Sequence, residues 1–199
     1  MSRVATRLVA VLVPVALLTP AAARAEKVVT EDAVGDAVTL VDEAVDLGEA
    51  VPAPDHEATD VIRTAVAHGA KRLRVGVAFR ALERDPFQFI VIRVRTPQGN
   101  YELLVERLGG KPITSIDRGP RTVDCEGLGA KVDLRADTVT ASLPTSCLDA
   151  PRWVQIGVGA VSVSGQQANP ELDAAYADDA HRDGAIRDTI ATGPKVRRG

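Results

Sequence analysis

The amino-acid sequence predicts an all-β protein, an antiparallel β-sandwich of about 8–10 strands. Three observations lead to this fold class. Apolar and polar residues alternate in several short segments, turn-forming residues recur about every 8–12 residues, and no long segment has the 3.6-residue period of an amphipathic helix. A small closed β-barrel would give the same pattern and is the alternative.

The clearest strands form two expected hairpins. In the first, apolar side chains from Leu73 to Phe79 alternate with small or charged ones, as in a strand with one buried face. In the second, the turn Pro97-Gln98-Gly99-Asn100 joins two apolar segments. The paired ranges are 60–67 with 73–79, and 87–96 with 101–107.

The rest of the chain is assigned segment by segment. Gly157 and Gly159 interrupt an alternating segment, which indicates either a bulge or a close backbone approach. Residues 171–177 could form one or two helical turns, and 185–199 an edge strand or a loose end. Further strands are expected at 38–41, 113–117, 132–135, 138–143 and 153–163, with loops at 48–59 and 178–184.

Residues 1–25 have the organisation of a cleavable secretory signal peptide. Arg3 and Arg7 precede an apolar run at 8–18, and Ala23-Arg24-Ala25 fits the signal-peptidase rule. The apolar run is too short to cross a bilayer core of ~30 Å, and no later segment is long enough. We expect cleavage after Ala25 and a secreted protein. An uncleaved N-terminal anchor is the alternative.

The mature chain is expected to be a single domain, in which a polar N-terminal segment at 26–59 joins a sandwich body at 60–199. Its two cysteines, Cys125 and Cys147, would enter an oxidising compartment. An even cysteine count in an exported protein predicts a disulfide, with two free buried thiols as the alternative.

Charge and aromatic content argue against nucleic acid as a partner. The formal net charge is −3, and it becomes −6 when Arg3, Arg7 and Arg24 leave with the signal, which holds no acid. Nucleic-acid binding needs a basic surface. Aromatic residues make up only 3% of the chain, which argues against base-stacking platforms and, more weakly, against aromatic shelves for sugar rings.

Acidic loops near both chain ends suggest one cofactor, a structural Ca²⁺. This ion takes six to eight oxygen ligands, and the acids stand in glycine-containing loops. The spacing does not match an EF-hand loop, and Asp-Gly sequences also simply form turns, which is the alternative. The candidate ligands are Asp32, Asp36, Asp178, Asp179 and Asp183.

No catalytic residue is assigned from the sequence. It holds no Gly-x-Ser-x-Gly elbow and no complete phosphate-binding loop. His56, His68 and His181 lack metal-ligand spacing, and His68 is expected in a solvated turn. The single tryptophan, Trp153, is interpreted as a core residue or as an exposed ligand contact.

A charged row is expected on the outside of the sandwich. Arg72, Arg74 and Arg80 would lie on one strand face. This row is interpreted as a solvated outer face, with an anion site as the alternative.

Several short runs resemble segments of small uncharacterised secreted proteins from actinobacteria. These are Asp32-x-x-Gly-Asp36, Pro144-x-x-Cys147-Leu148 and the Pro-Arg-Trp-Val strand start at 151–154. The resemblance implies a secreted β-sandwich and no activity. More loosely, the opening acidic turn and alternating strands are similar to DOMON and family 9 carbohydrate-binding domains. The chain lacks the Met and His of haem-binding members and the paired tryptophans of the sugar binders.

These observations together predict a non-enzymatic extracellular binding or accessory module. Its expected partner is a cell-wall glycan or a protein. The alternative is an extracellular hydrolase with an unrecognised carboxylate pair, since any two acids can face each other across a cleft.

Overall fold

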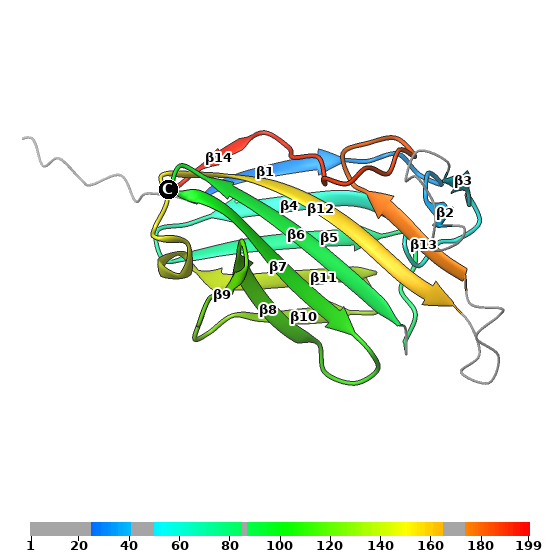
Figure 1. Cartoon of the computed structure of the whole chain (residues 1–199), viewed down its shortest axis with the longest axis horizontal. Helices are drawn as coiled ribbons and strands as arrows, with labels where there is room; N and C mark the ends of the chain where they lie inside the picture. Colours follow the sequence, from blue (N-terminus) through cyan, green and yellow to red (C-terminus); the bar gives the residue numbers. More distant parts are fainter. Residues whose placement is uncertain (1–24, 41–49, 85–86, 165–173) are drawn as a thin grey trace, which may run out of the picture.

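The computed structural model describes residues 25–40, 50–84, 87–164 and 174–199, and the predicted signal peptide lies almost wholly outside them. Within these ranges the chain forms fourteen strands and one short 3₁₀ helix, η2 (Thr145–Leu148). The strands make two antiparallel sheets, one behind the other (Figure 1). This confirms the predicted sandwich, with two sheets in place of one closed barrel, although the strands are more numerous than the 8–10 expected.

The smaller sheet has five strands and contains the first predicted hairpin. Its order is β1-β4-β5-β11-β10. Every pairing is antiparallel, and β4 pairs with β5 from Val61 opposite Phe79 to His68 opposite Leu73. The bounds are β1 (Glu26–Glu31), β4 (Val61–His68), β5 (Arg72–Phe79), β10 (Gly129–Asp133) and β11 (Thr138–Pro144).

The larger sheet contains the second hairpin. Its order is β3-β2-β13-β12-β6-β7-β8-β9, and β14 pairs with the start of β12. The bounds are β2 (Val38–Leu40), β3 (Val51–Pro52), β6 (Gln88–Thr96), β7 (Gly99–Arg107), β8 (Ile113–Arg118), β9 (Arg121–Thr122), β12 (Trp153–Ser164), β13 (Ala174–Asp179) and β14 (Lys195–Arg197).

The core lies between the two sheets and follows from the period-two pattern of the sequence. Successive side chains of a strand point to opposite faces, so every second apolar residue is buried. Leu73, Val75 and Val77 of β5 are at most 1% exposed and belong to the same apolar cluster as Ile90 and Ile92 of β6. Burial of such side chains is the main favourable term in folding.

Four strands were not expected from the sequence: the two-residue strands β3 and β9, of which β3 lies in the expected loop at 48–59, and the longer strands β1 and β13. β1 lies in the segment interpreted as polar, and β13 replaces the helical turns expected at 171–177, of which residues 171–173 lie outside the described residues. β1 is an edge strand with only intermediate or exposed side chains. β13 includes Ala174, Ala175 and Ala177, and alanine has no strand preference. Neither segment therefore carries a strong local signal.

Trp153 does not lie in the core. Its ring is partly exposed on the outer side of β12, and the Lys195 ammonium lies 4.4 Å from the ring centroid. The interpretation as a core residue is therefore wrong. Its neighbour Val154 is the fully buried residue at this point of the strand.

His68 is buried, in contrast to the expected solvated turn residue. It is the last residue of β4 and is 0% exposed, because its side chain faces inward next to β14. Its Nδ1 lies 3.2 Å from the Val196 carbonyl oxygen, and its Nε2 has no partner. Burial lowers the pKa of His68. The Val196 carbonyl and Glu26 oppose this shift and Arg198 adds to it.

The predicted disulfide is present between Cys125 and Cys147, with an S–S distance of 2.06 Å and a Cα–Cα distance of 5.5 Å. It joins the loop before β10 to η2, and both cysteines pack against the core. Closing a loop with a sequence separation of 22 stabilises the fold by roughly 3 kcal/mol in the chain-entropy model.

Residues 185–194, here called the strap, cross the outer side of β12. A Cβ at Gly157 would lie 2.1 Å from the Ala191 carbonyl oxygen, and one at Gly159 would lie 3.0 Å from Ile190 Cδ1. The two glycines therefore mark a close backbone approach, which confirms one of the two interpretations made from the sequence.

No helix in the described part of the chain is long and apolar enough to cross a membrane.

We expect Gly157→Ala to destabilise the protein by about 1–3 kcal/mol, because the new methyl group displaces the strap. Gly129→Ala is the matched control, since a Cβ there meets no atom within 4 Å, and we expect a change within about 0.5 kcal/mol. Urea unfolding measures both. Equal free energies of unfolding for the two variants would contradict the packing of the strap.

His68 should make the fold acid-sensitive. Its pKa is lowered in the native state and is about 6.5 in the unfolded chain. The contribution of His68 to the stability is therefore complete above about pH 6.5 and is lost as the pH falls towards the native pKa, by up to about 1.4 kcal/mol per pH unit. A glutamine side chain can still donate to the Val196 carbonyl but does not titrate, so His68→Gln should flatten this slope. Parallel profiles of wild type and variant between pH 7.5 and 5 would refute the assignment.

Candidate metal centre

Five aspartates gather near the ends of β1 and β13 and the start of β4. Carboxylate oxygens of Asp32, Asp36 and Asp183 lie within 4.8 Å of one another. The same holds for Asp36, Asp60 and Asp178. The two groups share Asp36, and we call their five members the acidic cluster.

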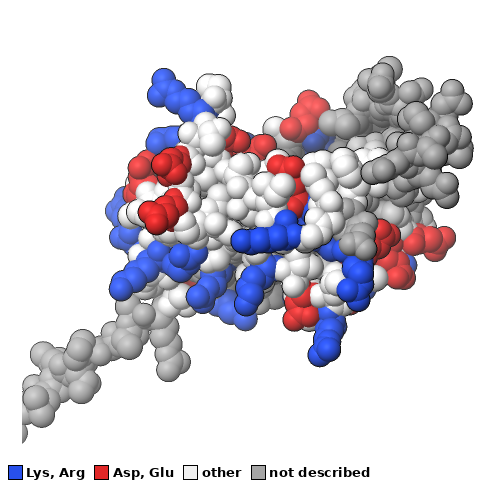
Figure 2. All heavy atoms as spheres, turned by 90° about the horizontal axis from the view of Figure 1, so that it is seen from below, with Lys and Arg blue, Asp and Glu red and all other residues white. Residues whose placement is uncertain are grey.

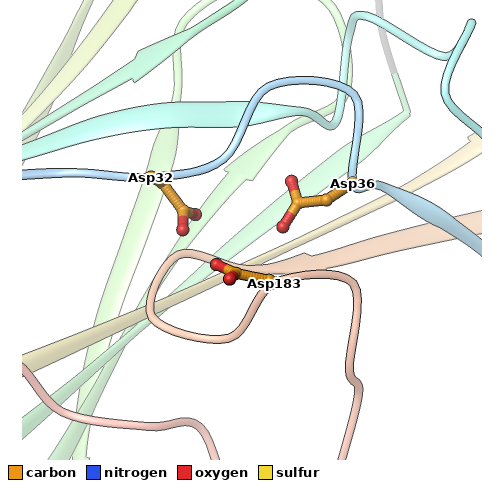
Figure 3. A group of neighbouring side chains, drawn as sticks. All are labelled: Asp32, Asp36 and Asp183. Carbon is orange, nitrogen blue, oxygen red and sulfur yellow. The ribbon is translucent and has the colours of Figure 1, made fainter.

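Three separate parts of the chain supply the cluster. Asp32 and Asp36 stand on the connection between β1 and β2, which passes from the smaller to the larger sheet, and Asp60 directly precedes β4. Asp178 is near the end of β13, and Asp183 is in the turn that follows. Figure 3 shows the side chains of Asp32, Asp36 and Asp183 pointing toward one another from two facing loops.

Two glycines shape these loops. Gly35 and Gly184 have φ values of +78° and +65°, in the left-handed region that glycine tolerates best. The Gly35 N–H donates to Asp60 Oδ2 at 2.7 Å, and the Gly184 N–H donates to Asp36 Oδ2 at 2.9 Å. These two backbone N–H groups each bind one oxygen of Asp60 and of Asp36. The other oxygen of each of these carboxylates has no hydrogen-bond partner.

Four of the five carboxylates each have a buried oxygen with no hydrogen-bond partner. Asp60 and Asp178 are 0% and 3% exposed. Their Oδ2 atoms accept hydrogen bonds, from the Val61 N–H at 2.7 Å in the case of Asp178. The unpartnered atoms are Asp32 Oδ2, Asp36 Oδ1, Asp60 Oδ1 and Asp178 Oδ1. Buried polar atoms almost always have a partner, so four such oxygens at one place need an explanation.

The pKa values follow from burial and from mutual repulsion. Burial, followed by the charges of Asp36 and Asp32, raises the pKa of Asp178 to about 8 against the Val61 hydrogen bond. Burial and the charge of Asp36 raise the pKa of Asp32 to about 7. Burial also raises the pKa of Asp36, with Asp60 and Asp183 adding to the shift. Carboxylates that resist ionisation this strongly lack a sufficient positive charge nearby.

Positive side chains balance little of this charge. Among the ion pairs of the described residues, one reaches the cluster, from Arg80 to Asp60 at 3.1 Å. The Arg80 guanidinium also binds Glu57 at 2.8 Å, so its charge is shared. The donor set is purely carboxylate oxygen, which is the chemistry of a hard cation such as Ca²⁺ or Mg²⁺.

The structure brings together four of the five aspartates selected from the sequence. Asp179 belongs to neither group, because consecutive residues of β13 point to opposite faces. Its Oδ2 accepts from the Ala191 N–H at 2.9 Å and pairs with Arg182 at 3.0 Å. Asp60 was missed, since it precedes a strand and no glycine-containing loop marks it.

A second polar group lies beside β12. His56 stacks on Tyr176 with ring centroids 3.6 Å apart, and its Nε2 lies 2.9 Å from the Ser162 hydroxyl oxygen. Ser162 also hydrogen-bonds Thr59, which is 0% exposed. Ser162 itself is only 6% exposed. This burial favours a structural role for Ser162, which links the 53–60 loop to the larger sheet, over a role as a nucleophile.

The other two histidines lie outside the cluster as well. His68 is at the far end of β4, and the ring of His181 packs against Gly193, with 3.1 Å from its Cε1 to a Cβ placed there. Burial lowers the pKa of His181, although Asp179 opposes the shift. Neither belongs to a group of metal-ligating residues in the described chain.

Comparisons with family models, with curated proteins and with solved structures found no match to this chain. The resemblance to secreted actinobacterial proteins and to carbohydrate-binding sandwiches is therefore still an expectation.

Proposed function

We propose that the protein is an exported β-sandwich module whose acidic cluster binds Ca²⁺. The observation that carries this proposal is the set of four buried carboxylate oxygens without partners, which come from three parts of the chain. A cation coordinated by these oxygens would supply the missing partners and the missing positive charge together.

Calcium fits this site better than other common cations. It accepts several carboxylates in irregular geometry at about 2.3–2.6 Å, whereas Mg²⁺ demands a near-ideal octahedron and keeps its waters. Zinc and copper sites are usually built with His or Cys, and neither group of the cluster contains one. Export by the predicted signal peptide would also bring the chain into contact with extracellular calcium.

The ion would act as a clasp between the sheets. Asp60 leads into β4 of the smaller sheet, and Asp178 lies on β13 of the larger sheet. Asp32, Asp36 and Asp183 add the loops that follow β1 and β13. A bound ion therefore joins both sheets and the segments near both chain ends, and would stabilise the native state by mass action.

A binding or accessory role is favoured over hydrolysis. Raised pKa values in a carboxylate group are also typical of an acid–base pair. However, Asp60 and Asp178 are 0% and 3% exposed, and the three surface depressions described for this chain are lined by other residues. A substrate would not reach the two most deeply buried carboxylates.

Calcium should raise the melting temperature of the mature protein. At a Ca²⁺ concentration of about 100 times the Kd, stabilisation is about 2.7 kcal/mol, which corresponds to about 5–10 °C for a chain of this size. Differential scanning fluorimetry after EDTA treatment measures the shift, and calorimetric titration gives the stoichiometry. Mg²⁺ should give a smaller shift. Equal melting temperatures in EDTA and in Ca²⁺ would refute the site.

Asp178→Asn should separate the destabilisation caused by burying the Asp178 carboxylate from the stabilisation provided by a bound ion. The amide oxygen can still accept from the Val61 N–H, and the amide nitrogen can donate to a neighbouring carboxylate. We expect the metal-free variant to be more stable than metal-free wild type by about 1–3 kcal/mol, and its calcium-induced shift to be lost.

The control is Asp124→Asn, an exposed aspartate outside the cluster, which should behave as wild type in both states. If metal-free Asp178→Asn were less stable than wild type and still responded fully to Ca²⁺, Asp178 would be a structural hydrogen-bond acceptor and not a ligand.

A further inference from the structure

The outer face of the five-stranded sheet has a smooth floor of small side chains. The strand registers align these residues in rows across the sheet. One row runs from Val29 through Ala65, Gly76 and Thr140 to Lys131. Its neighbours supply the rest of the floor, which comprises Ala65, Ala67, Gly76, Ala78, Thr138, Thr140 and Ser142.

Two depressions follow this floor. One of about 280 Å³ lies over β1, β4 and β5, and one of about 650 Å³ lies over β10 and β11. Both are lined by Thr138 and Thr140, so they adjoin on this face, and the two together are here called the trough. Five strands at the usual spacing of about 4.8 Å give it a length of roughly 19 Å.

Positive side chains border the trough. Lys27 and Arg63 line the smaller depression, and Arg84, Lys131 and Arg135 line the larger one. Arg74 is exposed on the same face, next to Ala67 and Ser142 in the register. Figure 2, which looks onto the edge of the sandwich from below, shows blue Lys and Arg side chains gathered along the lower part of the molecule.

Few acids oppose these charges. Glu31 and Asp133 stand at the two ends of one row, which also contains Arg63. An Asp133 oxygen accepts the N–H groups of Arg135 and Ala136 at 2.9 and 3.2 Å. That carboxylate therefore has a local role in the turn. The face is positive even though the mature chain is expected to carry a net charge of −6.

The other two arginines of the predicted row do not contribute in the same way. Arg72 donates to the Ser142 hydroxyl and to the Gly127 carbonyl, at 3.0 and 2.7 Å. Arg80 is paired with Glu57 and Asp60. The positive charge of this face therefore does not come from the row of three arginines predicted from the sequence. It comes from Lys and Arg side chains of β1, β4, β5, β10 and neighbouring turns.

We propose that the trough binds a linear acidic polysaccharide, with carboxylates of the chain at the basic rim and sugar rings on the floor. The Lys and Arg side chains match repeated single negative charges along an extended polymer. Thr138 and Thr140 offer hydroxyls to sugar hydroxyls, and the small Ala and Gly residues let a ring lie close to the backbone. The described residues of this face include no aromatic side chain on which a nucleic-acid base could stack.

None of the five proposed calcium ligands lines the trough. Polysaccharide binding there rests on the binding role of the proposed function and gives that role a partner class. A failure of polysaccharide binding would leave the calcium site in place, and a failure of calcium binding would leave the trough in place.

The experiment measures binding of the mature protein to immobilised hyaluronate by biolayer interferometry, with neutral dextran as a comparison. Wild type should bind hyaluronate but not dextran, and more weakly as the salt concentration rises. Arg63→Glu with Lys131→Glu should weaken binding about tenfold or more, because both charges border the trough. Gly76→Gln should also weaken it, since its side chain would project from the floor without adding charge.

The matched control is Arg95→Glu with Arg121→Glu, which changes the net charge equally at two exposed positions of the larger sheet. If this pair weakened binding as much as the trough pair, or if Gly76→Gln left binding unchanged, the trough would be excluded as the site.

Polyphosphate is the competitor that separates a glycan site from a general anion surface. The proposal requires hyaluronate to compete more strongly than polyphosphate of the same total charge. Equal or stronger competition by polyphosphate would overturn the polysaccharide as ligand, and no binding to hyaluronate at low salt would overturn the proposal as a whole.

Discussion

Burial of like charges at the junction of the two sheets is the constraint on which this end of the molecule depends. Asp60 and Asp178 are almost fully buried and belong to one group of converging carboxylates. Burying an unpaired carboxylate costs several kcal/mol, so a fold with no use for it would replace it by a neutral residue. The backbone N–H groups of Gly35, Val61 and Gly184 offset part of this cost. Each binds one oxygen of a carboxylate, those of Asp60, Asp178 and Asp36 respectively. The remaining oxygens define the positions where a cation would be most strongly stabilised.

The same constraint reaches the C-terminal part of the chain through β13. Asp178 points toward the cluster, and Asp179, the next residue, points toward the strap, where it holds the Ala191 N–H and Arg182. The strap then lies against Gly157 and Gly159 of β12. Displacing β13 would therefore disturb contacts on both of its faces, those of Asp178 in the acidic cluster and those of Asp179 with the Ala191 N–H and Arg182. This arrangement explains how a short strand with weak local preference is held in the larger sheet.

The sequence predicts the parts of this fold in which local pattern and tertiary packing agree. β5, β6 and β11 are apolar at every second position and lie where they were expected. β1 and β13 could not be recognised, because an edge strand and an alanine-rich strand are fixed mainly by pairing with neighbours. For the cluster, Asp-Gly loops identified Asp32, Asp36 and Asp183. Strand parity, which needs the exact position of β13, was required to separate Asp178 from Asp179, and only the three-dimensional structure shows that Asp60 joins them.

The acidic cluster and the trough are separate sites, but β1 connects them. Glu31 and Asp32 are consecutive: the first ends a row on the outer face, and the second belongs to the cluster. β1 is an edge strand that pairs only with β4 within the smaller sheet, and its outer side carries Lys27, which borders the trough. An ion bound through Asp32 would fix the end of β1. The basic side chains at the border of the trough would then lose less conformational entropy when they bind a polymer. Preorganisation of this kind strengthens binding without adding a contact. A calcium clasp would in this way support the recognition surface from a distance.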